Sequence, residues 1–121
     1  MNTLMTVIPK QWIDDGLVQV VSVMNTTHMT KEDDRLLTKA VNRTGIRDPK
    51  LGFVVRDMEP GYLLNLWAPG NELVDALEQA KAYGLSDELR NIIHATATEG
   101  YTHLRLDPDA PESDRWLTFN W

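Results

Sequence analysis

The fold of this chain is decided by LVQVVSVMNTTHMTKEDDRLL, residues 17–37, where an apolar run leads directly into an amphipathic one. Residues 17–24 are rich in β-branched side chains, which is typical of a well-buried strand. Thr30 stands three residues before Asp33, the spacing of a helix capping box. The apolar side chains that follow recur at helical spacing and form one stripe: Leu36, Leu37, Ala40 and Val41. The stretch therefore predicts a strand, a short turn and a helix that ends at about residue 43.

The same stretch places His28 just ahead of three consecutive acids, Glu32, Asp33 and Asp34. Acids in the first turn of a helix complement the positive end of its dipole, and each stabilises by about 0.3–1 kcal/mol. A hydrolase with paired carboxylates would instead need one acid in an apolar pocket and the other in water. We therefore expect the three acids to begin an exposed helix turn rather than to form a catalytic site.

The middle of the chain reads as a β-hairpin. Residues 51–58 and 61–68 are two apolar runs separated by Glu59 and Pro60, and Gly61 eases the bend between them. Both faces of the second run are largely apolar, which predicts a central rather than an edge strand.

A helix pair and a last strand complete the pattern. The first helix ends at Gly84 and the second is capped by Ser86, so we expect one helical element bent at residues 84–86. YTHLRLD, residues 101–107, alternates as a strand does. Residues 115–121 are expected to be an aromatic extended segment packed on the body, because exposed Trp and Phe would lower solubility.

These elements predict a single domain over residues 1–121, with an irregular N-terminal segment at 1–16. Their order is β-α-β-β-α(α)-β plus the C-terminal extended tail. The expected fold class is α+β, with an antiparallel sheet covered by helices on one face. The ferredoxin-like arrangement is the candidate topology.

Composition narrows the classes of function. The chain has no cysteine, which excludes disulfides and thiol catalysis, and 18 acids against 12 bases give a net charge of −6. Direct DNA binding is not expected, since such binding neutralises phosphates with Lys and Arg. No apolar run reaches the roughly 18–20 residues that span a bilayer, and residues 1–12 do not have the pattern of a signal peptide. A cytoplasmic protein without membrane association is expected.

The histidines offer one alternative. His28 and His103 lie on segments that the expected topology makes neighbours, and with Glu32 they could form a two-His-one-carboxylate metal site. No histidine has a spacing specific to metal sites, and no nucleophile motif is present, so structural roles are favoured and no cofactor is predicted. A small metal-dependent or acid/base enzyme using His28 and His103 is kept as the alternative.

Aromatic and acidic side chains supply the candidate interface. The aromatic candidates, which are anchors at interfaces about as often as they are core, are Trp67, Trp116, Phe119 and Trp121. The acidic candidates, which leave open a basic protein partner or mimicry of nucleic acid, are Asp107, Asp109, Glu112 and Asp114. If the tail added to a sheet edge, it could also pair with a second copy and form a homodimer.

Four segments carry a resemblance to a known family: TTHMTKEDDRLL, GYLLNLW, GLSDELRNII and the ending GYTHLRLDPDAP…FNW. Over about residues 17–121 their order resembles a family of small proteins whose domain has no known function. Its members are carried on bacterial plasmids, prophages and genomic islands. The resemblance implies a bacterial cytosolic protein of a mobile element, and it brings no catalytic residues with it.

The expected function follows from these points together. Small acidic accessory proteins of mobile elements often bind and block a host protein, and inhibitors of restriction or CRISPR complexes are familiar cases. We therefore expect a non-enzymatic protein-protein interaction protein whose partner is a bacterial host protein or protein complex. Inhibition of a host defence complex is the specific form of this expectation.

Overall fold

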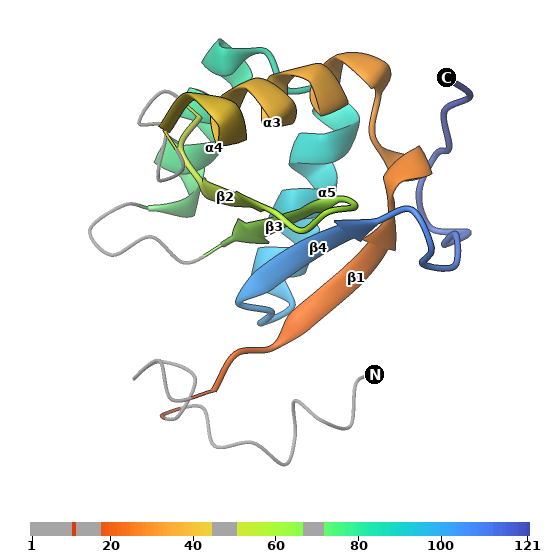
Figure 1. The fold of residues 1–121 in the computed structure, drawn as a ribbon. Helices are drawn as coiled ribbons and strands as arrows, with labels where there is room; N and C mark the ends of the chain where they lie inside the picture. The colour runs from red at the N-terminus through yellow and green to blue at the C-terminus, as the bar shows by residue number, and fades with distance from the viewer. Residues whose placement is uncertain (1–10, 12–17, 45–50, 67–71) are drawn as a thin grey trace.

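The computed structural model describes residues 18–44, 51–66 and 72–121, together with Gln11. The predicted N-terminal segment, apart from Gln11, and Trp67 lie outside the described residues. Within them, regular elements follow one another along the chain as Figure 1 shows. They are β1 (Val21–Asn25), a 3-10 turn η1 (Thr26–His28), α3 (Lys31–Thr44), β2 (Val54–Asp57), β3 (Tyr62–Asn65), α4 (Leu73–Tyr83), α5 (Asp87–Thr98) and β4 (His103–Asp107).

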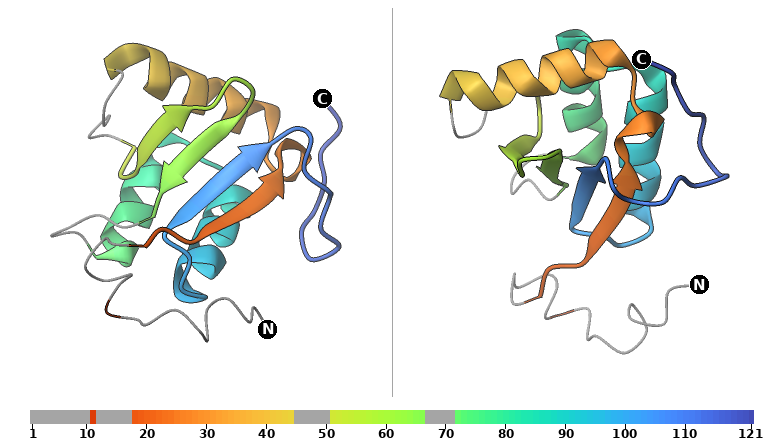
Figure 2. Two further views of the ribbon diagram at one scale, coloured as in Figure 1. Left: turned by 60° about the horizontal axis from the view of Figure 1, so that its bottom comes forward. Right: turned by 45° about the vertical axis from the view of Figure 1, so that its right-hand side comes forward.

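The strands form one four-stranded sheet in the order β1-β4-β3-β2. Helices α3, α4 and α5 cover one face of this sheet, and none of the elements named above covers the other face (Figure 2). The α+β class, the helices on one face and the element order of the ferredoxin-like arrangement are thus confirmed. β3 lies between β4 and β2, as the apolar character of both its faces predicted.

The sheet is mixed, whereas a wholly antiparallel sheet was expected. β1 and β4 run parallel, while β4–β3 and β3–β2 are antiparallel. The reason lies in residues 84–86: α4 and α5 pack against each other as two separate helices rather than as one bent element. The additional reversal of the chain between them turns β4 into the direction of β1.

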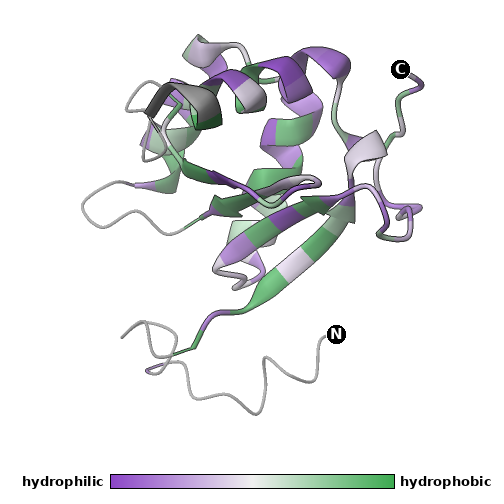
Figure 3. Cartoon of the chain, in the orientation of Figure 1, coloured by the Kyte–Doolittle hydropathy of each residue, from purple (hydrophilic) through white to green (hydrophobic). Residues whose placement is uncertain are grey.

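The core lies between the sheet and the helices. Strand side chains alternate, so Leu64 and Leu104 are paired across β3 and β4 on the helix side and are both fully buried. The alternation is visible as green and purple bands along β4 in Figure 3. On the opposite face Val21 and Val23 of β1 are 40% and 51% exposed.

The turn into α3 is closed by the predicted capping box. Thr30 Oγ1 accepts a hydrogen bond from the Asp33 N–H at 3.1 Å, and Asp33 Oδ2 accepts from the Thr30 N–H at 3.0 Å. The helix runs to Thr44, close to its predicted end. The expectation of three exposed acids is wrong for Asp33, which is fully buried because it also contacts Ser86, the N-cap residue of α5.

The β2–β3 hairpin turns at a cis Glu59–Pro60 peptide and at Gly61, which has a φ of +90°. A side chain at Gly61 would meet the carbonyl of Leu106 on the neighbouring β4. Glycine is therefore required both by the backbone conformation and by the close approach of the next strand. The strands are shorter than predicted, and the hairpin itself lies where the sequence placed it.

Candidate functional site

The C-terminal tail, residues 108–121, is hydrogen-bonded to the turn between β1 and α3. In Figures 1 and 2 it passes beside η1 and returns toward the start of α3. His28, which is fully buried, makes the central contact. Its Nε2 accepts a hydrogen bond from the Ser113 N–H at 2.8 Å, and its Nδ1 lies 2.9 Å from the Leu117 carbonyl oxygen. A neutral imidazole with its proton on Nδ1 satisfies both tail groups at once.

Asn25, immediately before η1, holds the beginning of the tail. Its Oδ1 accepts from the Thr27 N–H at 2.8 Å and caps the short turn. Its Nδ2 donates to the carbonyls of Pro108 and Ala110, at 3.2 and 2.5 Å. One amide side chain therefore shapes the turn and ties down the tail, using both its acceptor and its donors.

Backbone carbonyls of the turn hold the end of the tail. A turn as short as η1 leaves carbonyl groups without helical partners. The Phe119 N–H donates to the carbonyl of Thr27 at 2.8 Å, and the indole Nε1–H of Trp121 donates to the carbonyl of Met29 at 3.1 Å. The tail is thus ordered by hydrogen bonds from its first residues to its last.

The histidines do not form the alternative site. In β4, His103 pairs with Val21, while Asp107 at the opposite end pairs with Asn25, and His28 lies beyond that end. At about 3.3 Å per residue the two ends of β4 are roughly 13 Å apart. Both ring nitrogens of His28 are engaged by the tail, and the described residues contain no group of three His, Asp or Glu side chains arranged for a metal ion.

His103 is buried on the sheet face opposite α3, α4 and α5, with its Nδ1 2.8 Å from the hydroxyl of Thr102. Burial is the main cause that lowers the pKa of this imidazole, and the positive charge of Arg56 adds to the effect. Its environment thus favours the neutral ring.

The aromatic candidates of the tail differ in exposure. Trp116 is half-buried against the core and has the guanidinium of Arg115 4.7 Å from its ring centroid. Phe119 is also partly buried, while Trp121 remains 52% exposed. Leu117, which the sequence did not single out, is 67% exposed. The structure therefore assigns Trp116 to the packing of the tail, and it leaves Leu117 and Trp121 on its surface.

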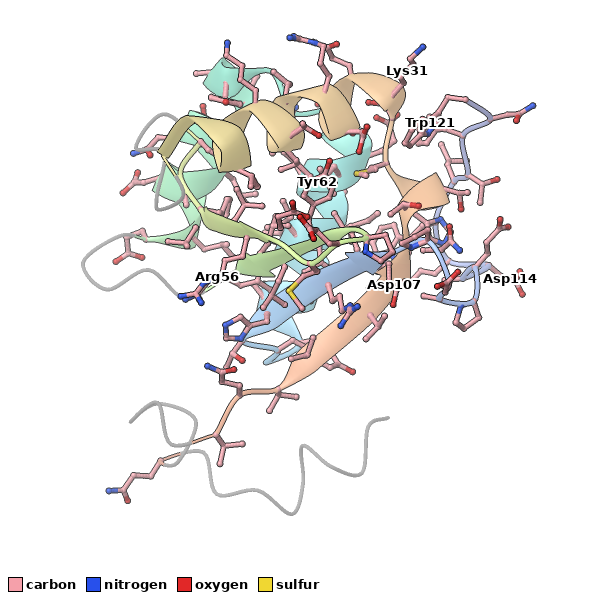
Figure 4. All side chains as sticks on the ribbon, in the orientation of Figure 1. Lys31, Arg56, Tyr62, Asp107, Asp114 and Trp121 are labelled. Carbon is pink, nitrogen blue, oxygen red and sulfur yellow. The ribbon has the colours of Figure 1, made fainter. Side chains whose placement is uncertain are left out.

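The acidic candidates also differ in how exposed they are. Asp107 is partly buried, lies 3.5 Å from Arg105 and accepts a hydrogen bond from the Asp109 N–H. Asp109, Glu112 and Asp114 are exposed, and none of them forms an ion pair within the part of the chain that the structure describes. Figure 4 shows Asp114 at the outer edge of the tail.

The exposed side chains of the tail include three carboxylates and two large apolar groups. We call them the tail surface: Asp109, Glu112, Asp114, Leu117 and Trp121. Trp is among the residues that most often anchor protein interfaces, and the rims around such anchors are polar.

A cleft borders the tail surface at Trp121. We call it the Tyr62 cleft; it has a volume of about 260 Å³, and its lining includes Thr26, Asp34, Thr38, Asp57, Tyr62 and Trp121. Figure 4 shows Tyr62 between α3 and the sheet. Its phenol oxygen lies 2.8 Å from Asp34 Oδ1 and 2.5 Å from the hydroxyl of Thr38.

This environment raises the pKa of the Tyr62 phenol. Burial, followed by the carboxylate of Asp34, raises its pKa to about 12, although the hydrogen bond with Thr38 acts in the opposite direction. The hydroxyl therefore keeps its proton at neutral pH and donates it to an acceptor such as Asp34.

Sequence reasoning did not single out the Tyr62 cleft. Asp34 and Thr38 are four residues apart on one helix, a spacing that places them on the same face. Nothing local to the sequence shows that this face meets Tyr62 of β3 and Trp121 of the tail.

The comparisons with known proteins add one finding. Residues 21–121 match the family described as Family of unknown function (DUF5983) C-terminal domain. No curated protein and no solved structure matches the chain significantly. Among the described residues, no helix is long and apolar enough to cross a membrane.

Proposed function

The chain belongs to this family of unknown function, and we propose that it is a non-enzymatic protein that binds a basic surface of a bacterial host protein or protein complex through its tail surface. The proposal rests on one observation: the side chain of Leu117 is exposed while hydrogen bonds hold its backbone in place. A scattered apolar residue on a protein surface needs no explanation. Leu117 differs because its own carbonyl is held by the buried His28 while its side chain is 67% exposed.

Preorganisation supports a binding role for this tail. Ordering a segment costs conformational entropy, and a partner that binds a disordered tail must supply that free energy. Here hydrogen bonds to Asn25, Thr27 and His28 already hold the backbone of the tail. Leu117 and Trp121 are therefore available to a partner at a lower entropic cost.

Charge supports the choice of partner. Asp109, Glu112 and Asp114 are exposed beside these apolar groups, and the whole chain has a net charge of −6. A positively charged protein surface complements them, and such complementarity speeds association and rejects acidic partners.

The finer identity of the partner rests on the resemblance to proteins of plasmids, prophages and genomic islands. In that setting the protein acts in the bacterial cytoplasm and blocks a host defence complex, of the restriction or CRISPR type. An acidic surface supports this role, because the surfaces of nucleic-acid-binding complexes are basic.

The test places a photoreactive amino acid at one of two positions of equal exposure. Leu117 and Val74 are both 67% exposed, but Val74 lies on α4, outside the tail surface. Irradiation in a bacterial lysate is expected to give one dominant adduct from position 117 and none from position 74. Mass spectrometry then identifies the adduct.

Binding to the purified partner completes the test. Leu117→Asp is expected to weaken it at least tenfold, while Val74→Asp leaves it unchanged. Equal adducts at both positions, or equal loss in both variants, would contradict the proposal. An adduct formed with a second copy of the chain would replace it with self-association.

A further inference from the structure

The Tyr62 cleft has the size of a side-chain subsite. Pockets for drug-sized ligands measure about 300–1,000 Å³, and this cleft, at about 260 Å³, lies just below that range. It is adjacent to the tail surface, because Trp121 belongs to both. A partner that covers the tail surface could therefore place one side chain in the cleft.

The cleft is negatively charged and its carboxylates lack cationic partners. Asp34 and Asp57 both line it, and within residues 18–44, 51–66 and 72–121 no Lys or Arg pairs with either. Arg35, on the neighbouring surface, is paired with Glu32, and Lys31 on that surface is exposed. The described lining of the cleft contains no positive charge.

An aromatic wall accompanies the carboxylates. The indole of Trp121 is oriented by its hydrogen bond to the carbonyl of Met29, and Tyr62, which is 9% exposed, forms part of the interior. Cations are attracted to the faces of aromatic rings by about 0.5–2 kcal/mol, and Trp is the strongest partner. Carboxylates and rings together select organic cations over anions and over neutral groups.

We propose that the Tyr62 cleft binds the guanidinium or ammonium group of one Arg or Lys side chain presented by the protein partner. The inference rests on the proposed function, since it assigns a specific contact to the same partner. Asp34 and Asp57 supply the charge, and Trp121 covers the alkyl part of the side chain. Because Trp121 also belongs to the tail surface, the two contacts share one residue.

The experiment titrates the ¹⁵N-labelled full chain with acetyl-Gly-Arg-Gly-amide and with the citrulline peptide, its neutral isostere. The arginine peptide is expected to give saturable NMR shifts at the Trp121 indole N–H and the Gly61 amide. The citrulline peptide is expected to bind at least tenfold more weakly. Equal shifts with both peptides would overturn the assignment of a cation.

Two variants with the same change of charge locate the site. Asp57→Asn keeps the oxygen that accepts from the Glu59 N–H, so the turn is retained while the charge is removed. Asp57→Asn is expected to weaken binding of the arginine peptide at least threefold. Asp75→Asn, at an exposed position of α4, is expected to leave that binding unchanged. Equal losses of affinity in both variants would show that only the net charge of the protein matters, and would overturn the proposal.

A last comparison separates two sources of the cation. The guanidinium ion alone is expected to bind more weakly than the arginine peptide, and tighter binding of the free ion would overturn a role for a partner's side chain. The result does not depend on the cross-linking at position 117. Peptide binding without a tail adduct would end the proposed function alone, and the reverse would end the cation subsite alone.

Discussion

The carboxylate of Asp33 accepts hydrogen bonds from both the backbone N–H and the hydroxyl of Ser86, at 2.8 and 2.6 Å. Ser86 is the N-cap of α5, while Asp33 lies in the first turn of α3, so this contact joins the starts of two helices. With the Thr30 N–H as a third donor, a fully buried carboxylate is satisfied without a cation among the described residues.

Asp33→Asn is expected to lower the free energy of unfolding by about 2–3 kcal/mol. The amide presents a donor where a carboxylate oxygen accepts, so one or two partly buried donors lose their partner, and each loss costs about 1–3 kcal/mol. Urea denaturation measures the change. Glu32→Gln, which affects only an exposed pair with Arg35, is expected to cost much less, because solvent screens such a pair. Similar losses in both variants would show that Asp33 does not join the helices.

His28→Ala is expected to release the tail and to lower the free energy of unfolding by about 1–3 kcal/mol, because the Ser113 N–H and the Leu117 carbonyl lose their partner. Chymotrypsin should then cleave after Leu117 or Phe119 much faster than in the wild type. His94→Ala, at an exposed position of α5, serves as the control. Unchanged cleavage in His28→Ala would show that other contacts suffice to hold the tail.

Gly61→Ala is expected to destabilise the hairpin by about 2–4 kcal/mol, because φ is +90° and the new Cβ meets the Leu106 carbonyl. Gly84→Ala also has a positive φ, but its Cβ meets only the side chain of Leu36, at 3.2 Å. We expect this second variant to cost about half as much. Thermal denaturation ranks the two, and the reverse order would contradict the close approach of β4 to Gly61.

The phenol of Tyr62 is expected to titrate with a pKa of about 12, above the ordinary value of 10.0. Because the folded-state pKa is raised, the stability that this group contributes is complete below pH 10. It is lost as the pH rises from 10 through about 12. Ultraviolet difference titration against Tyr62→Phe isolates the signal, since the chain has 3 tyrosines. A midpoint near 10 for the missing phenol would contradict its burial beside Asp34.

Local rules were sufficient for the elements themselves. Thr30 and Asp33 are three residues apart, and their capping box forms as the sequence predicted. Gly84 ends α4 in a left-handed conformation, and Ser86 caps α5 by accepting from the Leu89 N–H. Each of these interactions joins residues within one helical turn, so a sequence pattern contains all the atoms that decide it.

The sites depended on contacts that no pattern contains. His28 and Ser113 are separated by 85 residues, and Tyr62 and Asp34 by 28. Both pairs meet only after α5 turns back on α4 and β4 enters the sheet beside β1. By itself the sequence determined which segments form helices and strands and where α3 and α5 are capped, and capping follows from hydrogen bonds between near neighbours. Only the tertiary structure made His28 the anchor of the tail, because packing of the whole core decides which distant segments share an edge.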